Sequence, residues 1–597
     1  MKKYFLLFTF SFLLSPFYSS AQSNDWFWAS HGKDGVTGTG GLGVNIVATD
    51  YSADCFLTGI LFGGDSIHFG PYNLWNNGNN NEDIFLVKFD PNGNVLWAKQ
   101  SQQKDNNSAI GNGYVVSTDG AGNAYIMADF FDTISFDSYT LKTQGWWAND
   151  MFLVKYDPNG NVKWVEQSQV PSPTSLVAGN SLATDRKGNS YITGAFFDSV
   201  YFGGKTIIGT LSADTIEYTF LTKYDANGNV KWAKQSTGHS RIGSGGTCIA
   251  VNNSGGVFIA GSFNDSVTFG AFKLTTRPTF GDVFVVKYDT NGNVKWARAG
   301  IFPSSHNIAI PIGIAADNFG YIYVAGSFWD TLTFGPYTLT DPNPNAYNTN
   351  IFIVKYDANG NVKWAKTPTR LDNNPWLASG LSSDNKGEVF MSGAGQNVGL
   401  CKICFGKDTL SIDDTGRFDT PSFVVKYDSS GNVLCATINP CAGGGNTSTW
   451  SGVASDTSGN YVYLGGILFT EGIFGKDTIN PFAYYPSGGE LPFIARWREC
   501  EPTLGVAEVK GESAEVKVYP NPSSGVFQLE ITNEKIGINN MVEVYNILGE
   551  KVYSQQFLIS NSQFLINLST QPNGVYLYRL ITETGNLAGE GKLVIER

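Results

Sequence analysis

The chain has 597 residues, of which only 15% are charged, and a formal net charge of −12. It contains no basic run, which argues against nucleic acid or anionic lipid as a partner. The length exceeds what one ordinary core supports, whereas 69 glycines and 14% aromatic residues are typical of strands, turns and stacked sheets.

Residues 1–21 have the pattern of a secretory signal peptide. Two lysines precede an apolar run that ends at Tyr18, and the small residues up to Ala21 form a cleavage site. The apolar run is too short to span a bilayer. We therefore expect an exported, soluble protein that begins after Ala21.

Residues 22–500 are organised around a repeat of about 68 residues. Its clearest copy, DMFLVKYDPNGNVKWVEQS, runs from Asp150 to Ser168. One cation marks each copy, at intervals of 64 to 71 residues: Lys88, Lys155, Lys223, Lys287, Lys355, Lys426 and Arg496. A period of this length predicts stacked units, none of which can bury its apolar face alone.

The repeat predicts two β-hairpins and no helix. Alternating apolar side chains lead into Asp157–Asn161, where Pro and Gly favour a type I turn followed by a bulge. Another hairpin precedes this one, as in Ser181–Phe196. Four antiparallel strands per unit, which we name A to D, predict the blades of a β-propeller. The Asp-x-Asn-Gly-Asn turn is a weaker match to a calcium loop, because Ser168 stands where a Glu is expected.

Strand D carries a tryptophan at the same place in most units, which predicts a spacer between neighbouring sheets. These structural tryptophans are Trp28, Trp97, Trp164, Trp232, Trp296 and Trp364, and Cys435 takes this place in the sixth unit. The seventh unit stops after Phe493–Trp497 and has no strand D. We expect Asp25–Ser30 to supply it, because an open edge in an all-β ring is unfavourable. The expected fold is an all-β, seven-bladed β-propeller closed by the N-terminal strand.

Residues 501–514 form a polar linker, after which the repeat motif no longer occurs. Residues 515–597 alternate again, and turn signals at Gly549, Pro572–Gly574 and Gly585 divide them into short strands. This pattern predicts a separate domain, a small Ig-like β-sandwich.

Two parts of the chain resemble known families. Val518–Pro522 with Gly525, the segment VYNILGEKV, Gly574–Tyr576 and the closing KLVIE look like the type A C-terminal sorting domain of the type IX secretion system. This resemblance implies that the type IX secretion machinery recognises residues 515–597. It also implies a protein secreted from, or held on, the outer-membrane surface of a Gram-negative bacterium. The repeats resemble the SBBP-type β-propeller family, which implies a fold and no settled activity. The YDxxGNVxW pattern is also similar to the tryptophan-docking repeat of quinoprotein-like propellers.

Four of the seven cysteines belong to the sixth unit: Cys401, Cys404, Cys435 and Cys441. Their spacing is not a familiar zinc pattern, and export favours disulfides over free thiols or a metal site. We expect at least one disulfide among the four, with Cys404 and Cys441 near each other.

Three further patterns have both a functional and a structural interpretation. Gly38–Gly43 fits GxGxxG, but a strand follows it where a dinucleotide site needs a helix. The histidines favour solvated loops over a metal site because their offsets from strand D differ: His31, His68, His239 and His306. An aspartate followed by Ser or Thr recurs at Asp65, Asp132, Asp198, Asp265 and Asp330. Because Asp-Ser and Asp-Thr are turn chemistry, we expect turns there and not catalytic acids.

No motif identifies a reaction, a cofactor or a metal site. In a propeller the A–B and C–D turns share one face, and the longer B–C and D–A connections share the other, where recognition usually resides. Aromatic residues on those connections are candidates for contact with a sugar or peptide: Trp75, Trp146, Trp147, Tyr347 and Trp376. We expect a monomeric, secreted or cell-surface binding, adhesion or scaffold module with a glycan or protein ligand. The alternative is a glycan-active or quinoprotein-like propeller enzyme; a glycosidase would need two carboxylates at a defined separation, which a sequence does not establish.

Overall fold

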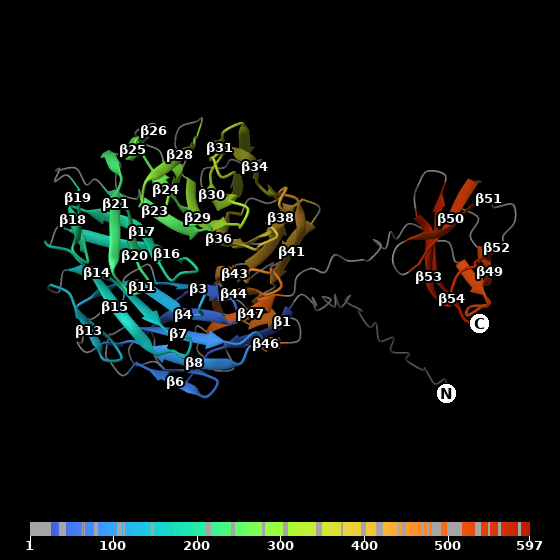
Figure 1. Ribbon diagram of the computed structural model, residues 1–597, viewed down its shortest axis with the longest axis horizontal. Coiled ribbons are helices and arrows are strands. Elements are labelled where there is room, and N and C mark those ends of the chain that lie inside the picture. Colours follow the sequence, from blue (N-terminus) through green and yellow to red (C-terminus); the bar gives the residue numbers. More distant parts are fainter. Residues whose placement is uncertain are drawn as a thin grey trace, which may run out of the picture. The chain divides into compact units, whose positions relative to one another are not determined.

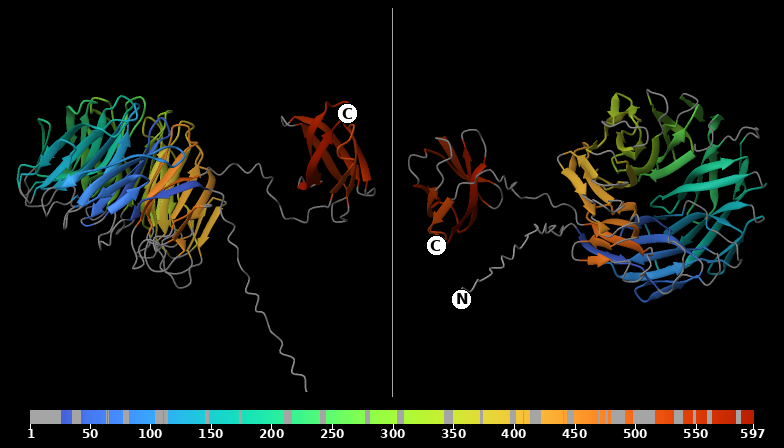
Figure 2. Two further views of the ribbon diagram at one scale, coloured as in Figure 1. Left: turned by 90° about the horizontal axis from the view of Figure 1, so that it is seen from below. Right: turned by 180° about the vertical axis from the view of Figure 1, so that it is seen from behind.

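In the computed structural model each of the seven units has four antiparallel strands in one sheet, and one of these sheets continues into a further two-stranded hairpin (Figures 1 and 2). The chain separates into two compact units, Met1–Cys500 and Glu501–Arg597. The structure describes residues 26–34, 43–62, 64, 66–76, 82–103, 110, 114–144, 148–172, 175–209, 217–239, 245–276, 281–302, 309–341, 349–371, 374–395, 401–406, 408–412, 422–439, 441–442, 449–468, 471–474, 477–479, 491–497, 516–531, 539–546, 550–558, 563–582 and 587–597.

The seven sheets, numbered I to VII, each contain strands A, B, C and D in that spatial order. Sheets I to III consist of β3 (Gly43–Thr49), β4 (Cys55–Phe62), β7 (Glu82–Phe89) and β8 (Val95–Gln100); β10 (Val115–Thr118), β11 (Ala124–Phe131), β14 (Asn149–Tyr156) and β15 (Val162–Gln169); and β16 (Leu176–Thr184), β17 (Ser190–Phe197), β20 (Tyr218–Tyr224) and β21 (Val230–Gln235). Sheets IV and V consist of β23 (Gly245–Val251), β24 (Val257–Phe263), β27 (Asp282–Tyr288) and β28 (Val294–Gly300); and β29 (Ala309–Ala316), β30 (Ile322–Phe328), β33 (Asn350–Tyr356) and β34 (Val362–Lys366). Sheets VI and VII consist of β36 (Trp376–Ser383), β37 (Val389–Gly395), β40 (Ser422–Tyr427) and β41 (Val433–Asn439); and β43 (Thr449–Ser455), β44 (Val462–Leu468), β47 (Leu491–Trp497) and β1 (Trp26–His31).

The A strands lie around one axis, each in contact with the A strand of the next sheet. The last of them, β43, contacts the first, β3, so the sheets follow one another around a closed circle (Figure 2, right). Strands B and C are almost entirely buried because the neighbouring sheets cover both of their faces. The apolar clusters accordingly combine residues of adjacent sheets, as in the cluster that joins Phe258 of sheet IV to Phe352 of sheet V.

The N-terminal strand completes sheet VII. β1 pairs antiparallel with β47, with Trp28 opposite Arg496 and Ala29 opposite Ala495. The first described strand and the last strand of this unit therefore share one sheet, and the outer edge of β47 is covered.

Each repeat also contains a short hairpin between strands B and C, which the four-strand prediction missed. These hairpins are β5 (Ser66–Phe69) and β6 (Tyr72–Trp75), β12 (Thr133–Phe136) and β13 (Tyr139–Lys142), β18 (Ser199–Phe202) and β19 (Lys205–Ile208), β25 (Ser266–Phe269) and β26 (Phe272–Thr275), β31 (Thr331–Phe334) and β32 (Tyr337–Thr340), β38 (Cys401–Phe405) and β39 (Asp408–Ile412), and β45 (Glu471–Phe474) and β46 (Asp477–Ile479). Most of them pair with a short segment that follows strand D of the preceding sheet: β2 (Lys33–Asp34), β9 (Gln102–Gln103), β22 (Thr237–His239), β35 (Thr369–Arg370) or β42 (Cys441–Ala442). Four-residue strands carry too short an alternation to distinguish them from a loop in sequence.

Residues 516–597 form two sheets around a core of their own. One sheet contains β48 (Val516–Tyr519), β49 (Val526–Ile531) and β52 (Gln563–Asn567); the other contains β51 (Lys551–Leu558), β50 (Asn539–Asn546), β53 (Gly574–Thr582) and β54 (Leu587–Ile595). Phe527 and Leu529 of the first sheet pack with Val542, Tyr578 and Leu593 of the second. Across both units, the described residues contain no helix long and apolar enough to cross a membrane.

Candidate ligand-binding sites

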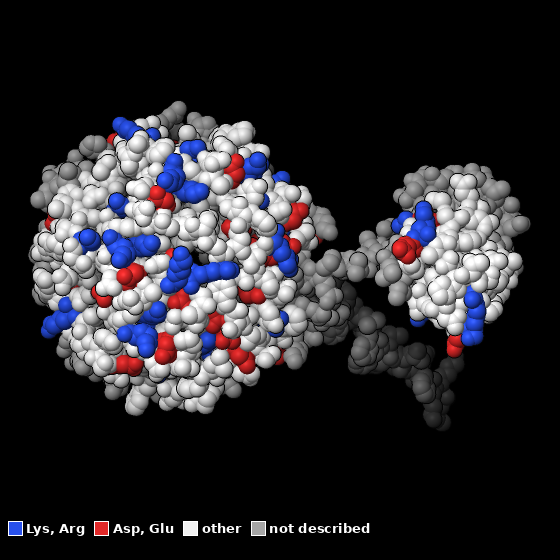
Figure 3. All heavy atoms as spheres, in the orientation of Figure 1, with Lys and Arg blue, Asp and Glu red and all other residues white. Residues whose placement is uncertain are grey.

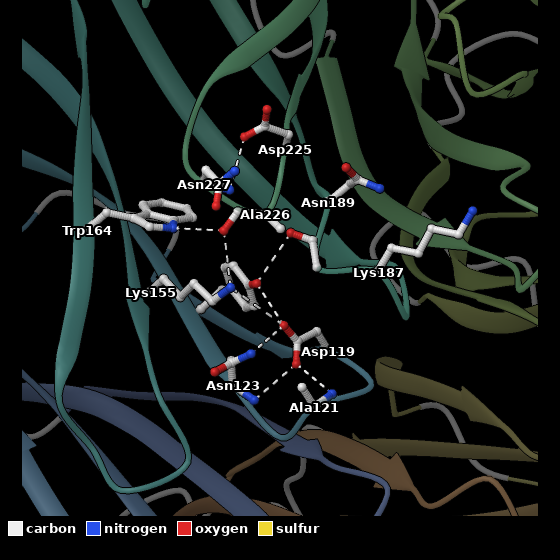
Figure 4. Close-up of polar contacts among 12 residues, drawn as sticks. Asp119, Ala121, Asn123, Lys155, Trp164, Lys187, Asn189, Asp225, Ala226 and Asn227 are labelled. Carbon is white, nitrogen blue, oxygen red and sulfur yellow. Dashed lines mark hydrogen bonds and ion pairs between the residues drawn. The ribbon is translucent and has the colours of Figure 1, made fainter.

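In five of the seven sheets, the cation and the tryptophan of the repeat together attach one sheet to the next. Lys155 Nζ and Trp164 Nε1 of sheet II both donate hydrogen bonds to the carbonyl of Ala226, at 3.2 and 3.1 Å (Figure 4). Ala226 belongs to the C–D turn of sheet III. The same shared acceptor recurs at Thr290, Ala358 and Ser429, and at Pro91 for Arg496 and Trp28.

The glycine of each C–D turn lies under the indole of the preceding sheet. Gly160 has φ +81°, and a Cβ at this position would lie 2.9 Å from the Trp97 ring. The ring in turn stacks on Tyr156, with centroids 6.3 Å apart. The repeated tryptophans therefore lie between sheets, as a spacer does, and Gly is required for backbone conformation and for close approach.

The aspartates that begin the C–D turns accept hydrogen bonds from backbone amides of the same turn. Asp157 Oδ1 accepts the amides of Asn159 and Asn161 at 3.0 and 2.9 Å. Partial burial raises the pKa of Asp157, but the hydrogen bonds from Asn161 and Asn159 outweigh it and lower the pKa. In the part of the chain that the structure describes, no group of three or more His, Cys, Asp or Glu residues could hold a metal ion. These carboxylates shape turns, and the calcium interpretation gains no support.

The recurring Asp-Ser and Asp-Thr positions begin the added hairpins. Asp132 has φ +64° and its carbonyl accepts the amide of Thr143, which closes the hairpin at 2.9 Å. Asp198, Asp265 and Asp330 share this left-handed conformation, which Asp tolerates better than most residues. Asp65 lies outside the described residues.

A cavity of about 550 Å³ follows the ring axis between the A strands. Hydroxyl groups and backbone line much of it, and some of these hydroxyls already bridge sheets: Thr118 Oγ1 donates to Thr49 O, and Thr247 Oγ1 donates to Pro311 O. No Asp, Glu, His, Lys or Arg belongs to its described lining. An uncharged channel of this kind offers little to orient a charged ligand.

A second cavity, of about 560 Å³, lies between sheets V and VI on the face that carries the A–B and C–D turns. We call it the V–VI pocket. The A–B turn of sheet V contributes Asp317, Phe319 and Tyr321, while strands C and D of that sheet contribute Lys355, Lys363 and Trp364. Sheet VI contributes Lys386, Ser429 and Ser430 from its two turns.

The base of the V–VI pocket is a fixed polar cluster. Lys355 Nζ donates to Ser429 O at 2.7 Å and lies 4.0 Å from the centre of the Tyr321 ring. Burial lowers the pKa of Lys355 against the attraction of Asp317. Burial likewise raises the pKa of Asp317, although amide and tyrosine hydrogen bonds oppose the rise. Lys355 therefore serves mainly to hold the two sheets and the Tyr321 ring in place.

The rim of the V–VI pocket is exposed. Phe319 is 65% exposed, and Lys363, Lys386, Ser429 and Ser430 are exposed as well. Neither Lys363 nor Lys386 forms an ion pair among the described residues. Partial burial raises the pKa of Asp357, but the hydrogen bonds from Asn361 and Asn359 lower it, and Lys363 lies near enough for its charge to help lower that pKa. An exposed aromatic ring and two ammonium groups outside ion pairs can contact a ligand without first breaking internal bonds.

The aromatic candidates predicted from the sequence have different outcomes. Trp75 ends β6 and is 59% exposed. The prediction for Trp376 is wrong: this residue begins β36, is fully buried and packs against Phe423, because the connection before it continues directly into an A strand. Trp146, Trp147 and Tyr347 lie outside the described residues. Sequence reasoning missed Phe319, although sheet V alone has aromatic residues at both the third and the fifth position of its A–B turn, Asp317–Tyr321.

The cysteines of sheet VI differ from the expected arrangement. Cys435 is disulfide-bonded, to a partner outside the described side chains. Cys404, which was expected to approach Cys441, is a free thiol 3.1 Å from Thr409 Oγ1. In the added hairpin Cys404 faces Thr409 across the strands, a pairing that a B–C loop without this hairpin would not produce.

Comparison with known proteins locates one family. Residues 517–596 match the secretion system C-terminal sorting domain. The sorting domain predicted from the sequence is thereby confirmed, and it indicates export by type IX secretion to the cell surface or the extracellular space in Bacteroidetes. In the remainder, the chain is 23% identical over 427 residues to an uncharacterized WD repeat-containing protein of Acanthamoeba polyphaga mimivirus. This alignment covers 60% of the chain and 29% of that relative.

Similar solved structures are distant. A protein of unknown function from Dyadobacter fermentans has 8% identity and a TM-score of 0.32, with 67% of this chain and 99% of that chain covered. A DUF4221 family member from Bacteroides vulgatus has 9% identity and a TM-score of 0.28, with 67% and 98% covered. Scores this low carry no argument about function.

Proposed function

We propose that this protein is a seven-bladed β-propeller exported by the type IX secretion system, and that it acts as a secreted or cell-surface binding, adhesion or scaffold module. The ring of seven sheets and its closure by β1 support the propeller assignment. The repeats also resemble the SBBP-type family. Export is supported by the sorting-domain match at residues 517–596.

The binding role rests on the contrast between the residues that join the sheets, which recur, and a surface position of the A–B turns, which varies. The residues that join the sheets, such as Trp164 and Lys155, have counterparts in nearly every repeat. The third position of the A–B turn varies without pattern and lies on the surface of this framework: Ser52, Ala121, Lys187, Ser254, Phe319, Lys386 and Ser458. Variable side chains on a rigid scaffold are typical of recognition surfaces.

Surface charge agrees with a specific ligand and not with general electrostatic attraction. Figure 3 shows Lys and Arg interspersed with Asp and Glu over one face of the ring, without a large region of one sign. A nucleic acid or an anionic membrane would favour an extended basic surface.

Binding and turnover distinguish a binding module from an enzyme. The full-length protein should retain particular glycans or proteins on an array, and the retained glycan should be recovered unchanged after prolonged incubation. Cleavage or oxidation of a bound glycan would contradict the proposal and favour the glycan-active or quinoprotein-like alternative.

Export is tested by removing residues 515–597. The truncated protein should accumulate in the periplasm, whereas the intact chain should reach the surface or the medium. Normal surface display of the truncated protein would contradict the role proposed for this domain.

A further inference from the structure

We propose that the V–VI pocket binds an acidic saccharide, that is, a sugar chain bearing carboxylate or sulfate groups. This inference rests on the proposed binding function and names its site and ligand class. It places recognition on the face of the A–B and C–D turns and not on the opposite face, where the sequence predicted it.

The charge of the pocket differs in sign from that of the chain. Its lining includes Lys355, Lys363 and Lys386 against the single carboxylate of Asp317, whereas the whole chain has a net charge of −12. A locally cationic cavity on an acidic protein selects anionic groups and disfavours neutral ones. Lys363 and Lys386 come from different sheets, so a ligand that contacts both would join sheet V to sheet VI.

The aromatic rim selects a ligand with an apolar face. Phe319 is 65% exposed, and the second aromatic residue of its turn, Tyr321, is held by the Lys355 ammonium, which lies 4.0 Å from the ring centre. A pyranose ring has a flat C–H face that packs on an aromatic ring, while its carboxylate or sulfate substituents reach the lysines. Ser429 and Ser430 add exposed hydroxyls that can bond sugar hydroxyls. An inorganic anion would use the lysines and leave Phe319 without a role.

The chain contains a matched comparison site between sheets II and III (Figure 4). By position in the repeat, Lys155, Lys163 and Lys187 correspond to Lys355, Lys363 and Lys386. Lys155 makes the equivalent bond to the next C–D turn. The aromatic residues are replaced there by Ala121 and Asn123, and Asn123 Nδ2 bonds Asp119 Oδ2 at 2.7 Å. The two sites therefore share their lysines and differ in the aromatic rim and in the C–D turn, where Ala226 and Asn227 replace Ser429 and Ser430. The comparison separates a charge effect from recognition of a sugar.

Titration calorimetry on the full-length protein tests the proposal with defined probes. The acidic probes are a chondroitin sulfate hexasaccharide and a galacturonate hexasaccharide; maltohexaose, inorganic sulfate and a hexaglutamate peptide serve as comparisons. We expect one or both acidic saccharides to bind, with an affinity that falls as salt rises. Lys363→Ala/Lys386→Ala and Phe319→Ala should each weaken this binding by at least about tenfold, whereas Lys163→Ala/Lys187→Ala should leave it within about twofold.

The possible results separate this inference from the proposed function. Failure of both acidic saccharides to bind would overturn the inference, as would equal affinity for hexaglutamate or equal losses in the two double-lysine variants. Binding of other glycans that is unaffected by Phe319→Ala would also overturn it while leaving the binding function standing. Because Phe319, Lys363 and Lys386 are exposed, unchanged thermal midpoints in these variants will show that folding is intact.

Discussion

Closure of the ring by the N-terminal strand predicts how much stability the protein loses when a contact of that strand is removed. Trp28 Nε1 donates to Pro91 O at 3.0 Å, and its ring lies on Gly93 and 5.9 Å from Tyr463. A buried Trp→Ala substitution costs about 3–5 kcal/mol. Because Trp28 is only half-buried, we expect Trp28→Ala to lower the free energy of unfolding by about 3 kcal/mol.

The expected shift in thermal midpoint follows from the size of the ring. Roughly 470 residues separate Trp26 from Trp497, and an unfolding entropy of about 2.1 cal/mol/K per residue gives about 1 kcal/mol/K in total. Trp28→Ala should therefore lower the midpoint by about 3 °C in scanning calorimetry. Trp232→Ala is the matched control, because Trp232 is also half-buried and bonds Thr290 O at 3.1 Å within a continuous part of the chain.

Two results would refute the closure. One is a Trp28→Ala midpoint unchanged from that of the wild type while Trp232→Ala shows the full decrease. The other comes from a crosslink: Ala29 and Ala495 are directly opposite in register, so Ala29→Cys/Ala495→Cys should form a disulfide under oxidising conditions. Peptide mapping that finds both new thiols free would show that β1 does not pair with β47.

Three further predictions concern other parts of the ring. Gly160→Ala should destabilise the protein more than Gly204→Ala, because both glycines have positive φ but only Gly160 lies against an indole, whereas a Cβ at Gly204 would meet nothing within 4 Å; equal losses in urea unfolding would contradict this. Arg370→Met should cost about 3–5 kcal/mol, because it removes the guanidinium that lies 2.7 Å from the fully buried carboxylate of Asp341; Lys231→Met, at the exposed pair with Asp225, should cost under about 1 kcal/mol. Burial, with the neighbouring carboxylate of Glu388, raises the pKa of Asp384 from its ordinary value of 3.8 to about 6. Ionisation of Asp384 therefore opposes folding above about pH 6. This loss of stability disappears as the pH falls towards 3.8. Asp384→Asn should therefore raise the thermal midpoint more at pH 7.5 than at pH 4.5, with Asn252 showing that Asn can make the same turn at the equivalent position; equal gains at both pH values would argue against it.

The sequence predicted the features of this fold that carry the same residue types in nearly every unit, and it missed the features that carry no such signature. The period, the turn at Asp157–Asn161 and the spacer tryptophans recur six or seven times, so a pattern repeated across units outweighs noise in any one of them. The added hairpins were missed, although they recur, because their strands have only three to five residues. Trp376 was misplaced because burial depends on where a connection ends and an A strand begins. Phe319 was overlooked because its role depends on the lysines of sheets V and VI, which only the fold brings together.

The irregular sixth unit shows how connectivity explains a departure from the repeat. Each strand D tryptophan needs the C–D turn of the next sheet, but sheet VII has no such turn, because its strand D is β1. Cys435 stands where the tryptophan would have no carbonyl to bond. The space is filled from the other side: Trp497 ends strand C of sheet VII, where the other sheets have Tyr or Phe, and it is fully buried against Phe390 of sheet VI. Its Nε1 has no hydrogen-bond partner among the described residues, as expected where the acceptor turn is missing. A small residue opposite a large one conserves the packed volume. Cys435, which is smaller than the usual Trp, and Trp497, which is larger than the usual Tyr or Phe, therefore compensate each other where the ring closes.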